Sequence, residues 1–199
     1  MMNQYEEKVI NYLRENSIVR TKDLKNLGLS STQIQNMVNK ELVKRIQRGL
    51  YSLPISMDDP YYEMQLKYKK LIFSHETALS LHNMTDVTPS KMTGTVPREY
   101  NYQYLVKEKG INVVRVNKKR YGLGIEQIIS PFGNSIAVTN RERTLCDVLQ
   151  KRSRIDSRII NDAFRNYLNS SQKNLNILMR YAKTFKVDKL IRNYMEVFL

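Results

Sequence analysis

Apolar residues in the first 53 positions recur at spacings that predict three short helices and a hairpin. The first helix runs from about Asn3 to Glu15, with Tyr5 on its apolar face. The second runs from Thr21, its expected cap, to Leu27, and Gly28 supplies the turn that ends it. The third runs from Ser31 to about Lys40. This order predicts a helix-turn-helix.

The third helix carries an amide-rich face. At 100° per residue Ile34, Met37 and Val38 lie on one side of this helix. The polar residues on the other side are Thr32, Gln33, Gln35, Asn36, Asn39 and Lys40. Asn and Gln pair with adenine edges in the major groove, Thr meets the thymine methyl, and Lys contacts phosphate or guanine. A plain solvated face is the alternative, but the position after a tight turn favours a helix that reads bases.

A hairpin follows the third helix. Two apolar-polar runs between Leu42 and Leu53 are hinged near Gly49, and Pro54 ends the second run because it lacks a backbone N–H. The cations on or beside the hairpin tip are Lys44, Arg45 and Arg48. Such a wing contacts the phosphate backbone or the minor groove. Residues 1–56 are therefore predicted to form a winged helix-turn-helix domain that binds DNA.

The rest of the chain, residues 57–199, is predicted to be a mixed domain. A short linker precedes helices from Tyr61 to about Ile72 and, capped by Ser74, from His75 to about Asn83. The expected strands, within about 91–138, are Met92–Val96, Ile111–Val116, Ile125–Ile129 and Ser135–Val138. The expected helices, within 140–199, are Arg141–Lys151, Ser157–Asn169 capped by Asp156, Leu175–Phe185 and Val187–Phe198. The connections between most strands are too short for helical crossovers, which indicates a small antiparallel or mixed sheet in an α+β fold.

Charge supports a polyanionic partner or an acidic protein surface as the partner. The chain has 33 Lys and Arg against 19 Asp and Glu, a net charge of +14. The net charge is +4 over residues 1–56, +3 over 57–140 and +7 over 141–199, so the winged helix alone does not account for it. The last two helices carry cations that could form one basic rim and extend a DNA footprint: Arg180, Lys183, Lys186, Lys189 and Arg192. A basic surface that only keeps the protein soluble is the alternative.

Composition also points to a compartment. The single cysteine, Cys146, lies among apolar residues, excludes an internal disulfide and fits a reducing environment. We find no apolar run near the roughly 20 residues that span a bilayer, and the N-terminal segment is a charged amphipathic helix rather than a signal peptide. The expectation is a cytoplasmic protein with no membrane partner.

Candidate catalytic and metal-binding groups are sparse. His75 and His82 are too far apart on one helix to chelate a metal side by side, and both are expected to be structural. Neighbouring Ser74, His75 and Glu76 are catalytic residue types, but adjacent helical positions point in different directions. Glu126 is the sole carboxylate between residues 111 and 138, whereas a metal-dependent nuclease needs several there. The sequence therefore predicts a protein that is not an enzyme and that has no catalytic residues, metal or cofactor.

Three segments, in this order and spacing after a winged helix, resemble the AbiEi antitoxins of bacterial abortive-infection systems. They are the wing end from Arg48 to Tyr51, the segment Phe73–His82 followed by Thr85, Asp86 and Pro89, and the segment Arg141–Asp147. The resemblance covers nearly the whole chain. It implies a two-domain regulator encoded beside AbiEii, a nucleotidyltransferase-like toxin.

The resemblance implies two activities. The winged helix would bind inverted repeats in the promoter of its own operon and repress it, and the C-terminal domain would counter the toxin during phage defence. The family is described as type IV, in which the antitoxin opposes the toxin's effect without a stable complex. With cations on both domains, we expect the bound DNA to bend.

Two other functions remain open. A single-component transcriptional regulator would sense a ligand with its C-terminal domain, and the sheet between Met92 and Val138 would then line a pocket. A nuclease targeted by the winged helix is disfavoured by the lack of clustered carboxylates.

Overall fold

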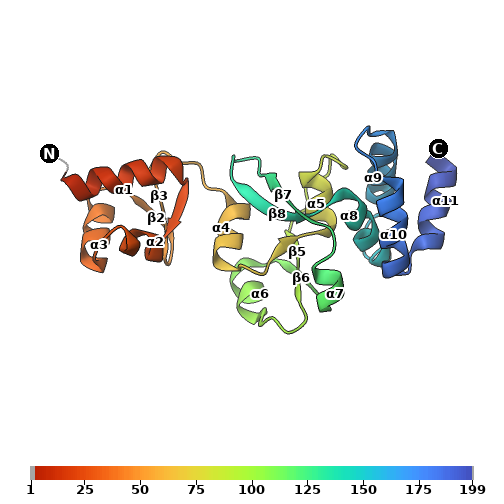
Figure 1. Cartoon of the computed structure of the whole chain (residues 1–199), viewed down its shortest axis with the longest axis horizontal. Coiled ribbons are helices and arrows are strands. Elements are labelled where there is room, and N and C mark those ends of the chain that lie inside the picture. The colour runs from red at the N-terminus through yellow and green to blue at the C-terminus, as the bar shows by residue number, and fades with distance from the viewer. Residues whose placement is uncertain (1–2, 199) are drawn as a thin grey trace. The chain divides into compact units, whose positions relative to one another are not determined.

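The structure, a computed structural model, describes residues 3–198, apart from the side chains at positions 108 and 109. The fold is α+β, as predicted, and the chain forms two compact units (Figure 1). Of the described residues, the first unit contains 3–67 and 132–134, and the second contains the others. The sequence predicts a domain boundary after residue 56. The structure groups the helix after the linker with the first unit, and where an independently folding domain ends stays a prediction.

The first unit has the element order of a winged helix. Its elements are α1 (Gln4–Glu15), β1 (Ile18–Arg20), α2 (Thr21–Asn26), α3 (Ser31–Asn39), β2 (Lys44–Gln47), β3 (Leu50–Ser52) and α4 (Pro60–Lys67). The strands form an antiparallel sheet in the order β1-β3-β2, so the predicted hairpin is present and gains a third strand. A core that includes Val9, Leu13, Leu24, Ile34 and Met37 joins the helices to this sheet.

Two local expectations for this unit are wrong. Thr21 does not cap α2: the residue before the helix is Arg20, whose backbone N–H donates to the Asp23 carboxylate at 2.9 Å. Tyr5 is 52% exposed rather than buried. Its neighbour Glu6 takes the buried position, because this carboxylate is satisfied by the Asn3 backbone N–H at 2.8 Å and by a lysine on α3.

The second unit is built on a five-stranded mixed sheet. Its strands are β4 (Ile72–Phe73), β5 (Thr93–Pro97), β6 (Asn112–Val116), β7 (Ile125–Ile129) and β8 (Ser135–Thr139), in the order β6-β5-β4-β8-β7. Pairs β4–β8 and β5–β6 are parallel, and β4–β5 and β7–β8 are antiparallel. The mixed sheet confirms the prediction, but the helix expected to reach Ile72 ends at Lys67, and Ile72 enters the central strand.

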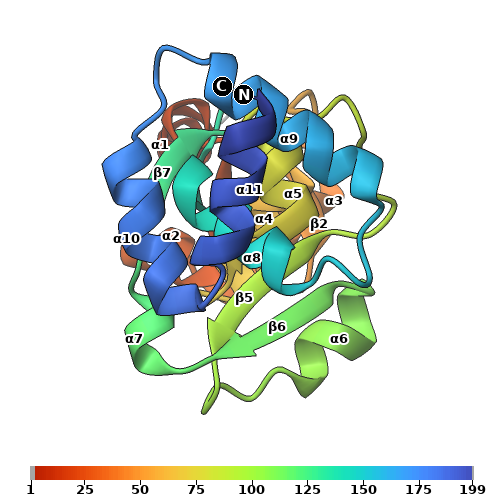
Figure 2. The ribbon, with the colours of Figure 1, turned by 90° about the vertical axis from the view of Figure 1, so that its right-hand side faces the viewer.

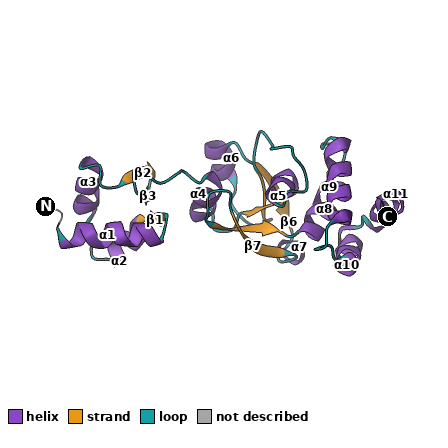
Figure 3. Ribbon diagram, turned by 90° about the horizontal axis from the view of Figure 1, so that it is seen from above, coloured by secondary structure: helices purple, strands orange, loops and turns teal. Residues whose placement is uncertain are grey.

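Helices cover this sheet and extend beyond it. Helix α5 (His75–Leu81) contacts both β5 and α8 (Figure 3). Two short helices, α6 (Gln103–Lys109) and α7 (Lys118–Tyr121), flank β6 and were not predicted. The C-terminal helices are α8 (Arg141–Gln150), α9 (Ser157–Asn169), α10 (Leu175–Phe185) and α11 (Asp188–Phe198). Helix α10 packs on α8 and α11, and α9 packs on the same two helices (Figure 2). The predicted four-helix region is confirmed.

Helix α8 carries an unusual buried arginine. Arg143 is fully buried, and its guanidinium pairs with Asp147 at 3.1 Å, donates to the backbone carbonyls of Arg120 and Leu123, and stacks on Phe185 at 5.3 Å. These contacts connect α8 to α7, to the segment that follows α7, and to α10. The residues of this segment therefore hold the fold together rather than face solvent.

Candidate nucleic-acid interface

The start of α3 is fixed by a reciprocal cap. The Gln33 backbone N–H donates to the Ser30 hydroxyl at 3.2 Å, and the Ser30 backbone N–H donates to the Gln33 side-chain oxygen at 2.8 Å. Ile34 and Met37, each 3% exposed, anchor the helix to the core. Because one face of α3 is held in this way, its other face must point to solvent.

All six residues predicted on the outer face of α3 are exposed, but they differ in how free they are. The Gln33 side chain is engaged in the cap, and the Gln35 amide donates to the Asn39 side chain at 3.0 Å. Among the described residues, Thr32 and Asn36 have no side-chain hydrogen bond. These two are one helical turn apart, so they share one strip of the surface. Because their side chains are exposed and not engaged within the protein, this strip is the part of α3 most available to contact base edges.

Lys40 has a second role that the sequence did not reveal. Its ammonium group pairs with Glu6 on α1 at 2.8 Å. The bonds from Lys40 and from the Asn3 backbone N–H lower the pKa of the Glu6 carboxyl. The contact ties the third helix to the first, and it offsets part of the positive charge that Lys40 would offer to a phosphate.

The wing turns at Arg48 and Gly49. Gly49 has φ +82°, a conformation that other residues rarely adopt, and its carbonyl accepts from the Thr21 backbone N–H at 3.0 Å. Arg45 and Arg48 are exposed, and among the described residues they form no ion pair. Lys44 is also exposed, but it pairs with Asp58 at 2.9 Å. Arg45 and Arg48 are thus the more available phosphate ligands.

The structure adds three candidates that the sequence reading missed. Lys22 and Lys25 are exposed on α2, the helix that crosses the phosphate backbone in helix-turn-helix complexes. Tyr5 lines a small cleft of about 80 Å³ together with Asn36 and Lys40. The charge of α2 was visible in the sequence, whereas the exposure of Tyr5 depends on which residue of α1 takes the buried position.

The predicted cations of the second unit are all exposed. Arg180 and Lys183 lie on α10, Lys186 ends that helix in the left-handed conformation at φ +57°, and Lys189 and Arg192 lie on α11. Helices α10 and α11 are in contact. The continuous basic rim and its role in DNA binding remain predictions.

The two histidines are buried. The Nε2–H of His82 donates to the Thr139 carbonyl at 2.7 Å, and burial lowers the pKa of His82 to about 4. His75 has φ +54° rather than helical geometry, so its Nδ1 comes within 2.9 Å of the Ser74 hydroxyl. The expectation that these neighbours point apart is therefore wrong. Ser74 is fully buried, and its hydroxyl is closed to any substrate.

Other expected features of the second unit can be placed directly. Asp156 caps α9 as predicted, but Ser74 makes no capping bond to α5 because its hydroxyl is engaged by His75 and Thr95. Cys146 is buried, and burial raises the pKa of its thiol. Within residues 3–198 we find no group of three His, Cys, Asp or Glu side chains placed to hold a metal ion. None of the described helices has the length and apolar character needed to cross a bilayer.

Part of the first unit is similar to a known protein family. Residues 7–54 match the family model described as "Transcriptional regulator, AbiEi antitoxin". The predicted AbiEi resemblance is thereby confirmed. The AbiEi match covers most of α1, the helix-turn-helix and the wing, which are the elements that carry the candidate interface. The family description thus supports a role as a transcriptional regulator and antitoxin for this chain.

A solved structure supports the fold over most of the chain. The crystal structure of the RV2827C protein from Mycobacterium tuberculosis has a TM-score of 0.60 and 12% sequence identity, covering 92% of this chain and 72% of that one. At this identity the similarity concerns the fold alone, and it extends beyond the AbiEi segment. The search of curated proteins gave no match.

Proposed function

We propose that this AbiEi-type regulator represses its own operon by binding inverted repeats in the promoter, and that it opposes the toxin encoded beside it. The observation that carries the proposal is the exposed strip of Thr32 and Asn36 on α3, with Arg45 and Arg48 on the adjoining wing. Both lie within the segment that matches a transcriptional regulator. Such a protein would act in the cytoplasm, where the promoter is.

We propose a division of labour between α3 and the wing. Asn36 would read a base edge, supported by the other exposed polar residues predicted on α3, which are Thr32, Gln33, Gln35, Asn39 and Lys40. Arg48 would bind phosphate, together with Arg45 and, once released from Asp58, Lys44. Base contacts set sequence preference, whereas phosphate contacts raise affinity for every sequence.

Point variants test this division. Asn36→Ala should lower affinity for the promoter repeat but leave affinity for a scrambled duplex unchanged, because only the base contact is lost. Arg48→Gln should weaken both duplexes equally and reduce the slope of log affinity against log salt by about one. Lys119→Gln, an exposed cation on α7, is the matched control for lost charge. If Asn36→Ala and Arg48→Gln reduce sequence preference equally, the division is wrong.

Toxin antagonism is the second half of the proposal. In a strain that expresses the neighbouring nucleotidyltransferase-like toxin, the full chain should restore growth. A variant with Asn36→Ala, Arg45→Gln and Arg48→Gln should still restore growth when driven from a foreign promoter, because the proposed antitoxin activity resides in the second unit. Growth arrest with the wild-type chain would contradict the antitoxin role. A stable complex with the toxin is not part of the proposal.

DNA bending follows from cations on both units. Contacts from Arg180, Lys183, Lys186, Lys189 and Arg192 would extend the footprint, and a curved duplex gains more of them. Bending a site by 40–90° costs roughly 1–6 kcal/mol, which several added phosphate contacts can offset. Energy transfer between dyes at the two ends of the promoter fragment should increase on binding. A variant with these five cations changed to Gln should bind without that increase; an equal increase would contradict the bending mechanism.

A single-component regulator that senses a ligand remains the second candidate. The observation in its favour is a groove in the second unit, lined in part by Thr93 of β5 and Asn112 of β6, within the sheet region where that hypothesis expects a pocket. Rescue from the toxin separates the two candidates, because a simple regulator gives none.

A further inference from the structure

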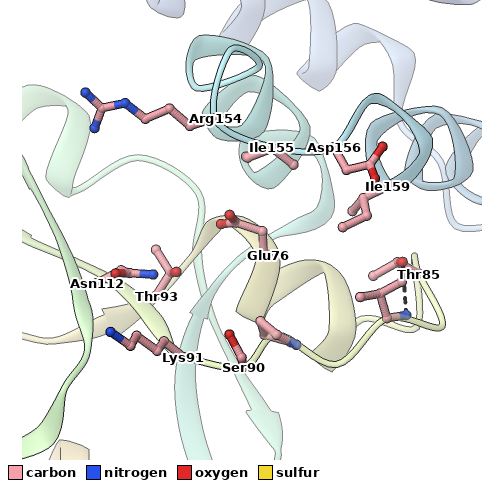
Figure 4. A pocket seen from close by; sticks show the side chains of 12 residues that line it. Glu76, Thr85, Ser90, Lys91, Thr93, Asn112, Arg154, Ile155, Asp156 and Ile159 are labelled. Atoms are coloured by element: carbon pink, nitrogen blue, oxygen red, sulfur yellow. Dashed lines mark hydrogen bonds between the residues drawn. The ribbon is translucent and has the colours of Figure 1, made fainter.

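A groove in the second unit has two adjoining parts. The larger part has a volume of about 400 Å³ and the smaller about 240 Å³. Both are lined by Glu76 of α5, Thr93 of β5, Asn112 of β6 and by Arg154 and Ile155, which lie between α8 and α9. Figure 4 shows Glu76 between the segment that carries Arg154 and the one that carries Lys91. The shared walls make the two parts one continuous groove.

The larger part is cationic. Arg115, Lys151 and Arg154 line it, against one carboxylate, Glu76. The guanidinium of Arg115 lies 5.1 Å from the centre of the Tyr102 ring, which holds its planar group in place. Arginine forks and lysine ammonium groups are the side chains that bind phosphate. This part of the groove is therefore suited to an anion with several oxygens.

His75 adds a directed hydrogen-bond donor to the same wall. The Thr95 hydroxyl donates to the Ser74 hydroxyl at 2.8 Å, and Ser74 lies 2.9 Å from Nδ1 of His75. In the tautomer in which the Ser74 hydroxyl donates to Nδ1, the imidazole carries its proton on Nε2. Burial lowers the pKa of His75, which keeps the ring neutral. His75 is among the residues that line the larger part of the groove.

The backbone at His75 is strained. It has φ +54°, which is unfavourable for any residue but glycine, and His75 is 3% exposed. Strained residues are concentrated at binding and catalytic sites, where the surrounding structure holds a side chain in a required direction.

The smaller part of the groove has a different character. Val87, Pro89, Ile155 and Ile159 contribute apolar walls, and polar and charged side chains, among them Lys91 and Asp156, line the rest. A site with a cationic end and an apolar end fits a ligand with a charged group at one end and a flat ring at the other. The volume of the larger part, about 400 Å³, is within the range of small-ligand pockets.

We propose that this groove binds a nucleotide. The phosphates lie against Arg115, Lys151, Arg154 and the Nε2–H of His75, and the base lies against the apolar walls. Glu76, between the two parts, accepts a hydrogen bond from a ribose hydroxyl. A DNA backbone offers phosphates as well, but a duplex cannot place a base in the apolar part, and the polarity of the groove favours the free nucleotide.

Calorimetric titration of the purified full chain tests this assignment. The probes are ATP, pyrophosphate and a short duplex of unrelated sequence. ATP should bind more tightly than pyrophosphate, because it fills both parts of the groove. The double variant Lys151→Gln and Arg154→Gln should lower ATP affinity about tenfold or more, since each loses a charge-assisted contact. Lys118→Gln with Lys119→Gln removes the same charge outside the groove and should leave ATP affinity unchanged.

A variant at His75 separates binding from folding. His75→Asn keeps a residue type that tolerates the left-handed conformation but lacks the ring donor, so ATP affinity should fall about fivefold while the circular dichroism spectrum is retained. No binding of ATP, equal affinity for ATP and pyrophosphate, or equal losses in the groove and control variants would overturn the proposal. A loss of duplex affinity without a loss of ATP affinity in the groove variants would overturn it too, since the groove would then serve DNA.

Discussion

The buried histidine of the second unit makes a quantitative prediction about stability. His82 is 6% exposed, its Nε2–H is bonded to the Thr139 carbonyl, and Glu126 lies 3.4 Å away. Burial lowers the pKa of His82 from 6.5 to about 4. The folded protein thus excludes a proton that the unfolded chain takes up as soon as the pH falls below 6.5.

The sign and size of the effect follow from proton linkage. Because the unfolded state binds more protons between about pH 6.5 and pH 4, the free energy of unfolding falls as the pH falls through this window. The pKa difference predicts a loss of about 2 kcal/mol between about pH 7.5 and pH 5. His75, whose pKa is also lowered by burial, acts in the same direction. Burial raises the pKa of the partly exposed Glu126, which opposes the loss.

The assay is urea unfolding followed by circular dichroism at both pH values. His82→Gln retains an amide donor for the Thr139 carbonyl but cannot titrate, so its stability should fall with pH by about 2 kcal/mol less than that of the wild type. Glu126→Gln is the control for the neighbouring carboxylate, and its stability should fall more steeply than that of the wild type. An identical pH dependence in the wild type and His82→Gln would refute the reasoning.

Two further predictions concern stability of the second unit. Gly124→Ala should lower the free energy of unfolding by more than about 2 kcal/mol, because φ is +58° and the new Cβ would lie 2.9 Å from the Cβ of Arg143. Gly110→Ala is the control: φ is +57° but nothing lies within 4 Å of a Cβ there, so the loss should be about 1 kcal/mol. Equal melting temperatures for the two variants would contradict this prediction. Asp147→Asn should cost about 3–5 kcal/mol, because it leaves the buried Arg143 guanidinium without its counter-charge. The exposed pair broken by Asp162→Asn should cost less than about 1 kcal/mol, and denaturant midpoints that fail to separate these two variants would refute the assignment.

The sequence predicted the elements with strong periodicity. The helix-turn-helix, the wing and the four C-terminal helices follow from repeated apolar positions, which pack into one core in each unit. Strand β1, with three residues, and β4, with two, carry too few positions for a period, and their identity depends on the strands beside them. Helices α6, with seven residues, and α7, with four, are also short, and neither has an apolar stripe that stands out from its surroundings.

The candidate interface was predictable in its exposure but not in its internal contacts. The outer face of α3 follows from helical geometry. The ion pairs of Lys40 with Glu6 and of Lys44 with Asp58 join positions 34 and 14 residues apart, and no local pattern indicates them. Burial of Arg143 was hidden for the same reason, since the carbonyls that satisfy it belong to distant residues.

The central claim is that α3 and the wing recognise the protein's own promoter. Its most direct test is the anisotropy of a labelled promoter fragment titrated with the full chain at graded salt, beside a scrambled fragment of the same composition. The account predicts that the promoter binds about 10³-fold more tightly or better, and that both affinities fall as salt rises. Equal affinity for the promoter and the scrambled fragment at every salt concentration would contradict it.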